Sequence, residues 1–196
     1  MQTEIEAKWL NVDKDELRAK LKKIGAELVQ PERLLVRALY DFADKSLQGK
    51  NSWVRVRDEA DKVTLSYKQL NDRTLHGTKE VTVVVDDFEV TCKFLESIGM
   101  QRKSHQETKR ESWQIGDIQV ELDTWPWIPS FVEIEAPDEK QLQQTAAKLE
   151  LDYAKALHGS VEPAYMAVYD VTEADINTWQ EITFSEVPDW LEQKRK

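Results

Sequence analysis

Paired acidic side chains are the first feature of this sequence that could carry chemistry. Side chains at positions i and i+2 of a β-strand share a face and lie about 7 Å apart. Two carboxylates placed in this way repel each other unless cations lie between them. Carboxylate oxygens are the ligands that hard cations such as Mg²⁺ or Mn²⁺ prefer. Three such pairs lie on segments with strand-like alternation: Glu4 and Glu6, Glu121 and Asp123, and Glu133 and Glu135.

Basic side chains alternate with apolar ones in the same manner. Arg55 and Arg57 are separated by Val56, for example. An arginine grips phosphate oxygens through its planar fork of donors. A cavity that gathered both the acidic and the basic sets would suit a metal-bound triphosphate. The basic set is Lys8, Arg37, Arg55, Arg57, Lys68 and Arg110.

A simpler arrangement would place each charged face in solvent and each apolar face under a helix. That is the usual arrangement for a single strand of an antiparallel sheet. Solvated faces, however, normally mix Thr, Ser, Gln and Lys, whereas here carboxylate pairs recur on three segments. We therefore favour an arrangement in which the charged faces point inward.

The elements that must position these residues can be predicted from hydrophobic periodicity. Period-two patterns predict strands, Asp13, Asp86-Asp87 and Pro137-Asp138 begin predicted helices, and Val161–Tyr169 is a further predicted helix. Eight strands with helices between them predict an α+β fold, in which an eight-stranded antiparallel β-barrel closes or nearly closes with the helices packed outside. The predicted strands cover residues 2–10, 28–41, 53–57, 63–68, 79–83, 104–114, 118–124 and 131–136.

Composition limits the remaining possibilities. The 196 residues suffice for one domain, which we place at 1–170, with 171–196 as a tail that packs on the barrel through Trp179 and Trp190. The net charge of −10 argues against a nucleic-acid partner, and no apolar run is long enough to cross a membrane. The single cysteine, Cys92, allows no internal disulfide and indicates a cytoplasmic protein with Cys92 in its core. Three histidines, none at ligand spacing, exclude a zinc site.

The stretch Glu4-Ile5-Glu6-Ala7-Lys8 resembles the N-terminal Glu-x-Glu-x-Lys strand of the CYTH superfamily, also called triphosphate tunnel metalloenzymes. The short signature is weak by itself, but the resemblance extends over roughly residues 1–170. In order and spacing the whole set is specific. The further matching residues are Tyr40-Asp41, Arg55-x-Arg57, Lys68, Lys109-Arg110, Glu121-Leu122-Asp123 and Phe131-Val132-Glu133-Ile134-Glu135.

The resemblance implies an eight-stranded tunnel that hydrolyses or cyclises triphosphates with Mg²⁺ or Mn²⁺. It implies that Lys8, Glu6 and Arg55 are catalytic and that Lys8 contacts phosphate or the attacking water. The implied metal ligands are Glu4, Glu6, Glu133, Glu135 and Asp123, with possible support from Glu80 and Glu121. The implied triphosphate-binding residues are Lys8, Arg37, Arg55, Arg57, Lys68, Arg110 and Trp53.

The sequence departs from the family pattern at two positions. Thr82 follows Glu80 where many members have a second glutamate, and Thr108 precedes Arg110 where a lysine is frequent. These departures put a second metal site and tight tripolyphosphate binding in doubt.

Several alternatives stay open. A metal-dependent triphosphatase is favoured over a class IV-type adenylyl cyclase and over a non-catalytic polyphosphate- or nucleotide-binding module. Trp53 resembles a tryptophan of animal thiamine triphosphatases and could stack on a base or thiazolium ring, or it could seal the tunnel mouth. The stretch Trp125–Pro129 is either a rigid loop at a tunnel mouth or a dimer contact. We expect a small-molecule triphosphate as ligand, no nucleic acid or membrane partner, and a monomer or homodimer.

Overall fold

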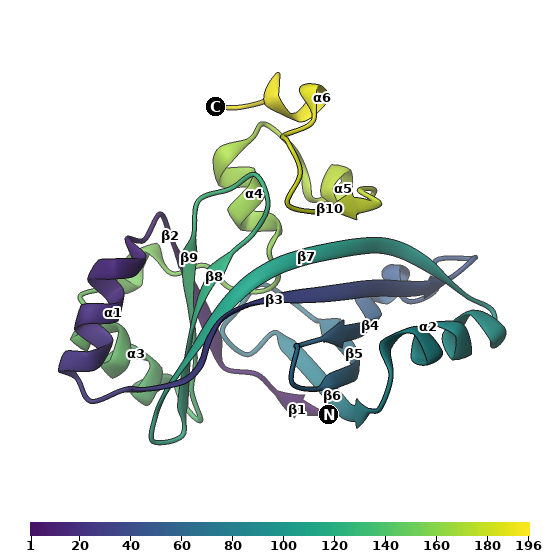
Figure 1. The fold of residues 1–196 in the computed structure, drawn as a ribbon. Coiled ribbons are helices and arrows are strands. Elements are labelled where there is room, and N and C mark those ends of the chain that lie inside the picture. The colour runs from purple at the N-terminus through teal and green to yellow at the C-terminus, as the bar shows by residue number, and fades with distance from the viewer.

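One curled, mostly antiparallel sheet organises the protein (Figure 1). The computed structural model describes residues 1–196 apart from the side chain of Gln2. The neighbouring strands follow the order β1-β6-β5-β4-β3-β7-β8-β9-β2, and β10 pairs with β7. The strands are β1 (Gln2–Thr3), β2 (Glu6–Leu10), β3 (Glu27–Phe42), β4 (Ser52–Asp58), β5 (Val63–Leu70), β6 (Thr78–Val85), β7 (Met100–Ile115), β8 (Ile118–Thr124), β9 (Phe131–Glu135) and β10 (Glu181–Ile182).

The predicted fold class is confirmed, but the barrel is open. The sequence predicts one continuous first strand over 2–10, and the structure divides it at Glu4 and Ile5. The first part pairs with β6 over two residues, and the second part pairs with β9 along its whole length. The N-terminal segment therefore crosses from one edge of the curled sheet to the other without completing a continuous ladder.

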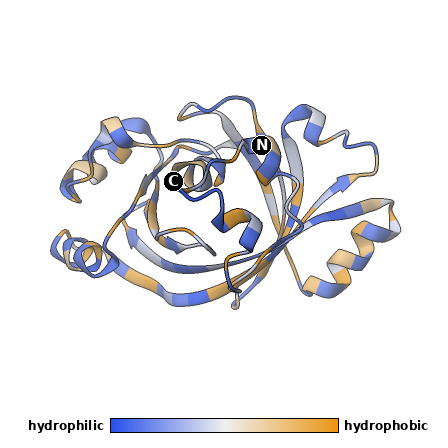
Figure 2. Ribbon diagram, turned by 90° about the horizontal axis from the view of Figure 1, so that it is seen from above, coloured by the Kyte–Doolittle hydropathy of each residue, from blue (hydrophilic) through white to orange (hydrophobic). Residues whose placement is uncertain are grey.

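Helices α1 (Lys14–Lys23), α2 (Phe88–Ser97), α3 (Glu139–Lys148) and α4 (Glu162–Val168) begin where the sequence predicts, and the first three pack on the outer face of the sheet. Helices α5 (Glu173–Ile176) and α6 (Asp189–Glu192) were not predicted. Asp13 caps α1, Asp87 caps α2 and Asp138 caps α3, because each side chain accepts backbone N–H groups of the first helical turn. Alternating hydrophilic and hydrophobic positions along the strands are visible in Figure 2. Short 3-10 turns lie at Gln48–Lys50 and Tyr153–Lys155.

Two hydrophobic clusters lie between the outer face of the sheet and helices α1, α2 and α3. One cluster joins Leu17 and Leu21 of α1 and Leu142 of α3 to apolar residues of β2, β8 and β9. A second cluster packs α2 against β3 and β4 and includes buried Cys92, as predicted. Because the strand residues of these two clusters face α1, α2 and α3, the residues that alternate with them face the concave side.

The C-terminal residues form a third cluster on the sheet. Strand β10 pairs in parallel with β7, and Trp179 packs edge-on against Tyr165 with ring centroids 5.2 Å apart. Trp190 packs against Trp179 and is about half exposed. None of the described helices combines the length and apolar character that crossing a bilayer requires.

Candidate functional site

The concave side of the sheet holds a cavity of about 1090 Å³. Every side chain that the sequence analysis names for catalysis, phosphate binding or metal binding lines this cavity. Strands β2 to β9 and the crossing N-terminal segment all contribute to it. The named residues that line it are Glu4, Glu6, Lys8, Arg37, Trp53, Arg55, Arg57, Lys68, Glu80, Arg110, Glu121, Asp123, Glu133 and Glu135.

Strand register explains why these residues meet. Glu6 lies opposite Glu135 and Lys8 lies opposite Glu133 in the β2–β9 pair. Their apolar neighbours, such as Ala7, point to the opposite face and are fully buried beneath α1 and α3. Charges on neighbouring strands are therefore brought side by side with the cavity on one face and the core on the other.

Lys8 lies at the centre of the acidic half of the cavity. Its Nζ lies 3.0 Å from a Glu133 carboxylate oxygen and 3.1 Å from one of Glu6, and it donates a 2.7 Å hydrogen bond to the carbonyl of Gly159. Burial by itself would lower the pKa of Lys8, but the carboxylates of Glu133 and Glu6 raise it well above its ordinary value. Lys8 is therefore a fixed ammonium ion at neutral pH.

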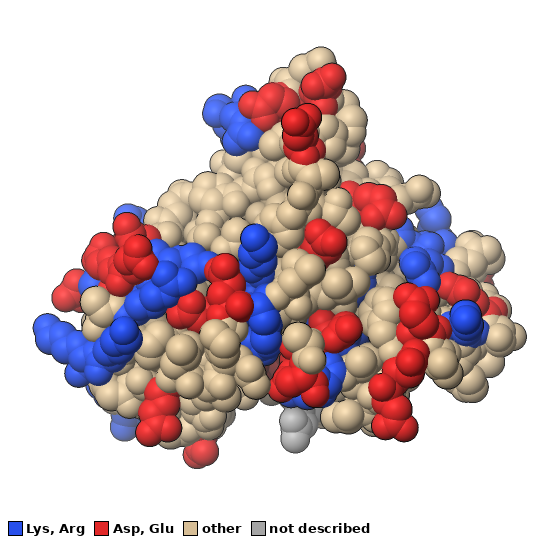
Figure 3. Space-filling view, viewed as in Figure 1, with Lys and Arg blue, Asp and Glu red and all other residues tan. Residues whose placement is uncertain are grey.

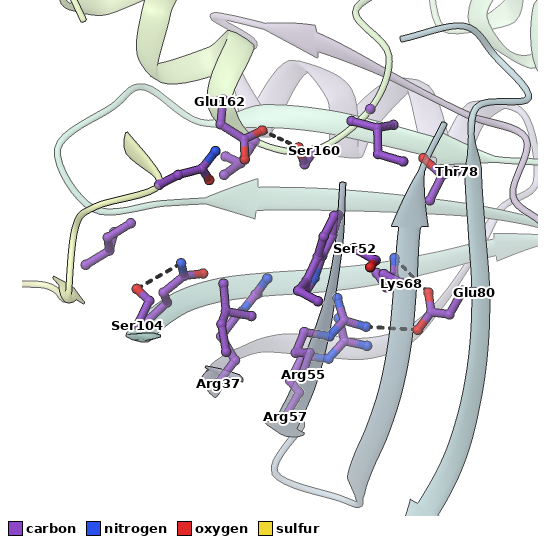
Figure 4. A pocket seen from close by; sticks show the side chains of 18 of the residues that line it. Arg37, Ser52, Arg55, Arg57, Lys68, Thr78, Glu80, Ser104, Ser160 and Glu162 are labelled. Atoms are coloured by element: carbon purple, nitrogen blue, oxygen red, sulfur yellow. Dashed lines mark hydrogen bonds and ion pairs between the residues drawn. The ribbon is translucent and has the colours of Figure 1, made fainter. Parts of the chain in front are cut away.

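Lys68 forms the second acidic–basic junction. Its Nζ lies 2.7 Å from a Glu80 oxygen and 3.0 Å from a Glu4 oxygen, and Arg55 reaches Glu80 at 3.2 Å (Figure 4). Burial and the hydrogen bond between the two carboxyls raise the pKa of Glu4 to about 8. Burial would also raise the pKa of Glu80, but the same hydrogen bond and the charges of Lys68 and Arg55 lower it. The two carboxyls thus share negative charge unequally.

Arg110 holds the third acidic pair. Its guanidinium makes a bidentate contact with Asp123, at 2.7 and 2.6 Å, and lies 3.5 Å from Glu133. Glu121 is 3.9 Å from Arg110, and one of its buried oxygens has no hydrogen-bond partner among the described residues. Burial raises the pKa of Glu121.

Glu135 lies near this cluster without an ion pair among the described residues. Burial raises its pKa first, and the neighbouring carboxylates of Glu133 and Glu6 raise it further. The acidic half therefore holds more carboxyl groups than its lysines and arginine pair with.

The basic half has the opposite imbalance, and Arg37 is its centre. Its only described hydrogen bond is to the Thr108 hydroxyl, at 2.6 Å, while its guanidinium stacks 4.6 Å above the ring of Trp125. No described carboxylate lies within ion-pair distance, and its buried Nε has no partner. Burial, then the charges of Arg57 and Arg55, hold the pKa of Arg37 well below its ordinary value.

Arg55 and Arg57 lie beside Arg37 on β4. Arg57 lies directly opposite Arg37 in the β3–β4 pair and is neutralised by Glu59 at 2.6 Å. The Nε of Arg55 is buried without a partner, although its Nη2 contacts Glu80. The three guanidinium groups lie together in the cavity (Figure 4). This half can therefore accept an anion that the protein itself does not supply.

Comparisons with known proteins agree with this geometry. A family model described as "CYTH domain" matches residues 2–162. The chain belongs to the CYTH domain family. No curated protein matches the sequence.

Solved structures share the CYTH fold at low sequence identity. A Vibrio parahaemolyticus protein described as a putative adenylate cyclase is 18% identical, with a TM-score of 0.71 over 84% of this chain and 98% of the other. A Pyrococcus horikoshii protein is 19% identical, with a TM-score of 0.66 over 78% and 93%. A Hippeastrum protein is 14% identical, with a TM-score of 0.57 over 89% and 94%, and is described as a putative adenylyl cyclase with a dominant triphosphatase activity.

The donor set of the CYTH cavity fits a hard divalent cation. Its acidic half offers carboxyl oxygens, and the unpaired carboxyl of Glu135 and the unpartnered oxygen of Glu121 leave oxygen atoms available for a cation. Among the described residues, however, no three carboxylates are arranged to hold a metal ion as they stand. Lys8, Lys68 and Arg110 hold several of them in ion pairs, so cation binding requires these pairs to loosen.

The two departures from the CYTH pattern have local roles. Thr108 accepts the hydrogen bond from Arg37, so the position orients a guanidinium where a lysine would add another charge. Thr82 exchanges a 2.6 Å hydrogen bond with Ser66 and also bonds Glu80, whose carboxylate already accepts from Lys68 and Arg55. Both threonines thus position charged neighbours.

Two tryptophans predicted near the tunnel mouth, Trp53 and Trp125, line the cavity. Trp53 lines the cavity and lies opposite Lys68 in the β4–β5 pair. Trp125 also lines it, beneath Arg37, and the following loop is held because Tyr165 and Tyr169 donate hydrogen bonds to the carbonyls of Pro126 and Trp127. The loop is therefore fixed at the cavity wall, whereas its role as a dimer contact stays a prediction.

Sequence reasoning missed Glu59 and Gly159. Glu59 lies two residues beyond Arg57 in the β4–β5 turn and pairs with it. The signal in the sequence was an acidic residue directly after a strand that carries two arginines. Gly159 supplies a carbonyl to Lys8 from a backbone at φ +86°, in the left-handed region that glycine adopts without strain. Nothing in the sequence indicated that this loop returns to β2.

Acidic and basic side chains are interspersed on the face of the protein seen in Figure 3. Although the net charge is −10, no single acidic patch covers that face. The separation of charge that matters for ligand binding lies inside the cavity, where water is partly excluded and Coulomb interactions are less screened.

Proposed function

We propose that this CYTH protein is a divalent-metal-dependent triphosphatase that binds the phosphate chain of an inorganic or organic triphosphate in the cavity. The observation that carries the proposal is the buried Arg37 guanidinium, which has no carboxylate partner among the described residues. A buried unpaired charge is strongly unfavourable unless a ligand compensates it. Its neighbours are also cationic, so the compensating ligand must carry several negative charges.

Arg37, Arg55 and Arg57 would bind the phosphate oxygens, with Lys68 and Arg110 at the boundary to the acidic half. Guanidinium groups suit this role because their donors match pairs of phosphate oxygens. The free Nε atoms of Arg37 and Arg55 are donors already directed away from any described partner. Trp53 would contact the substrate beyond its phosphates.

The acidic half would hold the cation. Glu4, Glu6, Glu133 and Glu135 would be its ligands, and Asp123, Glu121 and Glu80 would support them from the neighbouring strands. When bound, Mg²⁺ or Mn²⁺ would neutralise phosphate charge and polarise a phosphoryl oxygen.

Lys8 cannot act as a general base, because its carboxylate neighbours keep it protonated. We assign it to phosphate binding or to orienting the attacking water, with Glu6 as its acceptor partner at 3.1 Å. Arg55 would stabilise charge on the transferring phosphoryl group. Removing one such electrostatic contact costs about 10²- to 10³-fold in turnover in well-studied enzymes.

An adenylyl cyclase is the second candidate. The description of the Vibrio parahaemolyticus structure as a putative adenylate cyclase and the presence of Trp53 in the cavity favour a nucleotide ligand. The description of the Hippeastrum protein favours hydrolysis instead. Product analysis with ATP separates them, because hydrolysis releases phosphate whereas cyclisation releases pyrophosphate and cyclic AMP.

A substrate panel tests the proposal. Phosphate release should be measured with tripolyphosphate, nucleoside triphosphates and thiamine triphosphate, each with Mg²⁺ and Mn²⁺ separately. We expect metal-dependent release from at least one of them and its loss in Arg55→Met. Saturable triphosphate binding without metal, and no turnover of any substrate, would instead identify a non-catalytic binding module.

A further inference from the structure

Uncharged side chains adjoin Arg37 on the side that lies away from the acidic half. Along β7, Arg110 contacts the acidic half, and Gln106 and Ser104 follow on the same face of the strand at greater distance from it. Gln106 lies opposite Arg37 in the β3–β7 pair, and Ile182 of β10 lies on its other side. Gln106, Ser104 and Ile182 all line the cavity. The wall therefore changes from guanidinium groups to amide, hydroxyl and apolar groups directly beside Arg37.

A chain of hydrogen bonds fixes the orientation of the Gln106 amide. The Ser104 hydroxyl donates to the backbone carbonyl of Trp179, 2.8 Å away, which uses its single proton. Its oxygen then acts as an acceptor, and Nε2 of Gln106 donates to it at 3.2 Å (Figure 4). Because a side-chain amide carries its donors on nitrogen and its acceptor on oxygen, this contact leaves Oε1 of Gln106 as an acceptor without a partner among the described residues.

The free acceptor of Gln106 indicates what kind of ligand group lies beside it. Gln106 is 8% exposed and Ser104 is 6% exposed, so bulk water has little access to either. An acceptor in such a place is unfavourable until a donor reaches it. Phosphate oxygens act mainly as acceptors near neutral pH and do not meet this need. A hydroxyl or amino group does, and an organic triphosphate can carry one next to its phosphate chain.

We propose that Gln106 determines the choice between organic and inorganic triphosphates, because its Oε1 accepts a hydrogen bond from the nucleoside part of a nucleoside triphosphate. The inference rests on the function proposed above in one respect, that the phosphates bind at Arg37. A site that hydrogen-bonds a substrate hydroxyl or amino group discriminates against an analogue that lacks it, and tripolyphosphate lacks it. Ser104 and the carbonyl of Trp179 are positioning groups, so the segment after residue 170 shapes this site as well as packing on the sheet.

Equilibrium binding tests Gln106 without relying on turnover. The dissociation constants of ATP and of tripolyphosphate should be measured by calorimetry in EDTA, where a metal-dependent reaction cannot proceed. Gln106→Met keeps the length of the side chain and removes the amide. We expect it to raise the Kd of ATP about tenfold, the size of one hydrogen bond, and to leave the Kd of tripolyphosphate within about twofold. Gln119→Met is the matched control, since Gln119 lines the opposite, acidic end of the cavity, and it should change neither constant.

A second substitution tests the positioning role of Ser104. Ser104→Ala frees the Gln106 amide to rotate and should raise the Kd of ATP by about threefold, again without an effect on tripolyphosphate. In a protein that already carries Gln106→Met it should have no further effect on ATP binding, because it acts through the amide. A loss that simply adds to that of Gln106→Met would show a general structural role instead and contradict the assignment of Ser104.

The outcomes separate this inference from the proposed activity. Equal rises in Kd for ATP and tripolyphosphate in Gln106→Met would make Gln106 a phosphate ligand and overturn the proposal. An unchanged Kd for ATP, or a natural sequence that binds tripolyphosphate but not ATP, would overturn it too. A protein that shows the expected selective loss but hydrolyses no triphosphate would refute the triphosphatase and leave the role of Gln106 supported.

Discussion

Replacing Arg37 by methionine should make the ligand-free protein more stable and the enzyme inactive. Arg37 is 7% exposed and has no carboxylate within ion-pair distance among the described residues, while Arg57 and Arg55 add repulsion. Burying an uncompensated charge costs several kcal/mol. The Thr108 hydrogen bond returns about 1.5–3 kcal/mol and the Trp125 stack at most about 2 kcal/mol. We therefore expect a net gain of about 1–2 kcal/mol on removing the charge.

For a domain of this size, that gain corresponds to a rise in melting temperature of about 2–8 °C. The same substitution should lower turnover by about 10²- to 10³-fold, because it removes a phosphate contact. It should also abolish the stabilisation by tripolyphosphate, which for the natural sequence at 100 times Kd is about 2.7 kcal/mol. Thermal unfolding with and without tripolyphosphate, together with phosphate release, measures all three.

Arg57→Met is the matched control. Arg57 is paired with Glu59, so its removal leaves a buried carboxylate without its main partner and should lower ligand-free stability. If Arg37→Met raises the free energy of unfolding and Arg57→Met lowers it, the unpaired charge lies at Arg37. The reasoning is refuted if Arg37→Met destabilises the protein as much as Arg57→Met does, or if it hydrolyses triphosphate at an undiminished rate.

Three other predictions concern the acidic half and the outer face. Glu135→Gln should reduce metal-dependent turnover by about tenfold or more while leaving the fold intact. Phosphate release measured over a Mn²⁺ titration tests this, and full activity would show that Glu135 is not a metal ligand. Lys8→Met should lose activity and destabilise the protein by about 3–5 kcal/mol in urea unfolding, because it leaves buried carboxylates unpaired, and unchanged stability would contradict the ion-pair assignment. On the outer face, burial alone would raise the pKa of Glu111, but contacts from Arg18 and Trp113 outweigh it and lower the pKa below its ordinary value. The stability that this adds is fully present above the ordinary pKa of about 4.3 and is lost as pH falls through the lowered pKa. Unfolding of Glu111→Gln at pH 7 and pH 3 should show a weaker pH dependence than the natural sequence, and an equal dependence would refute this.

The sequence was sufficient to predict which residues share the cavity, because strand periodicity is an intrinsic property of the backbone. Glu133 and Glu135 alternate with buried Val132 and Ile134, so their inward direction follows from the apolar partners alone. Helix starts were predictable for a similar reason, since Asp87 and Asp138 cap the first turn through local contacts.

Contacts between distant segments could not be predicted in this way. The carbonyl of Gly159 meets Lys8 across 151 positions, and no local pattern encodes that distance. The division of the first strand at Glu4 also depends on two different partners, β6 and β9, competing for one segment. Periodicity predicts which face of the sheet a side chain lies on. Where a strand ends depends on which other strands it pairs with.

The distribution of ion pairs implies an order for ligand binding. Lys8, Lys68 and Arg110 already neutralise several carboxylates, so a cation arriving alone must compete with these ammonium and guanidinium groups. Arg37 has no such competitor, and a polyanion can bind there without breaking an existing pair. Once phosphates draw Lys68 and Arg110 toward the basic half, the carboxylates that they release become available to a cation. Triphosphate should therefore raise the affinity for Mg²⁺, and by thermodynamic reciprocity Mg²⁺ should raise the affinity for triphosphate by the same factor.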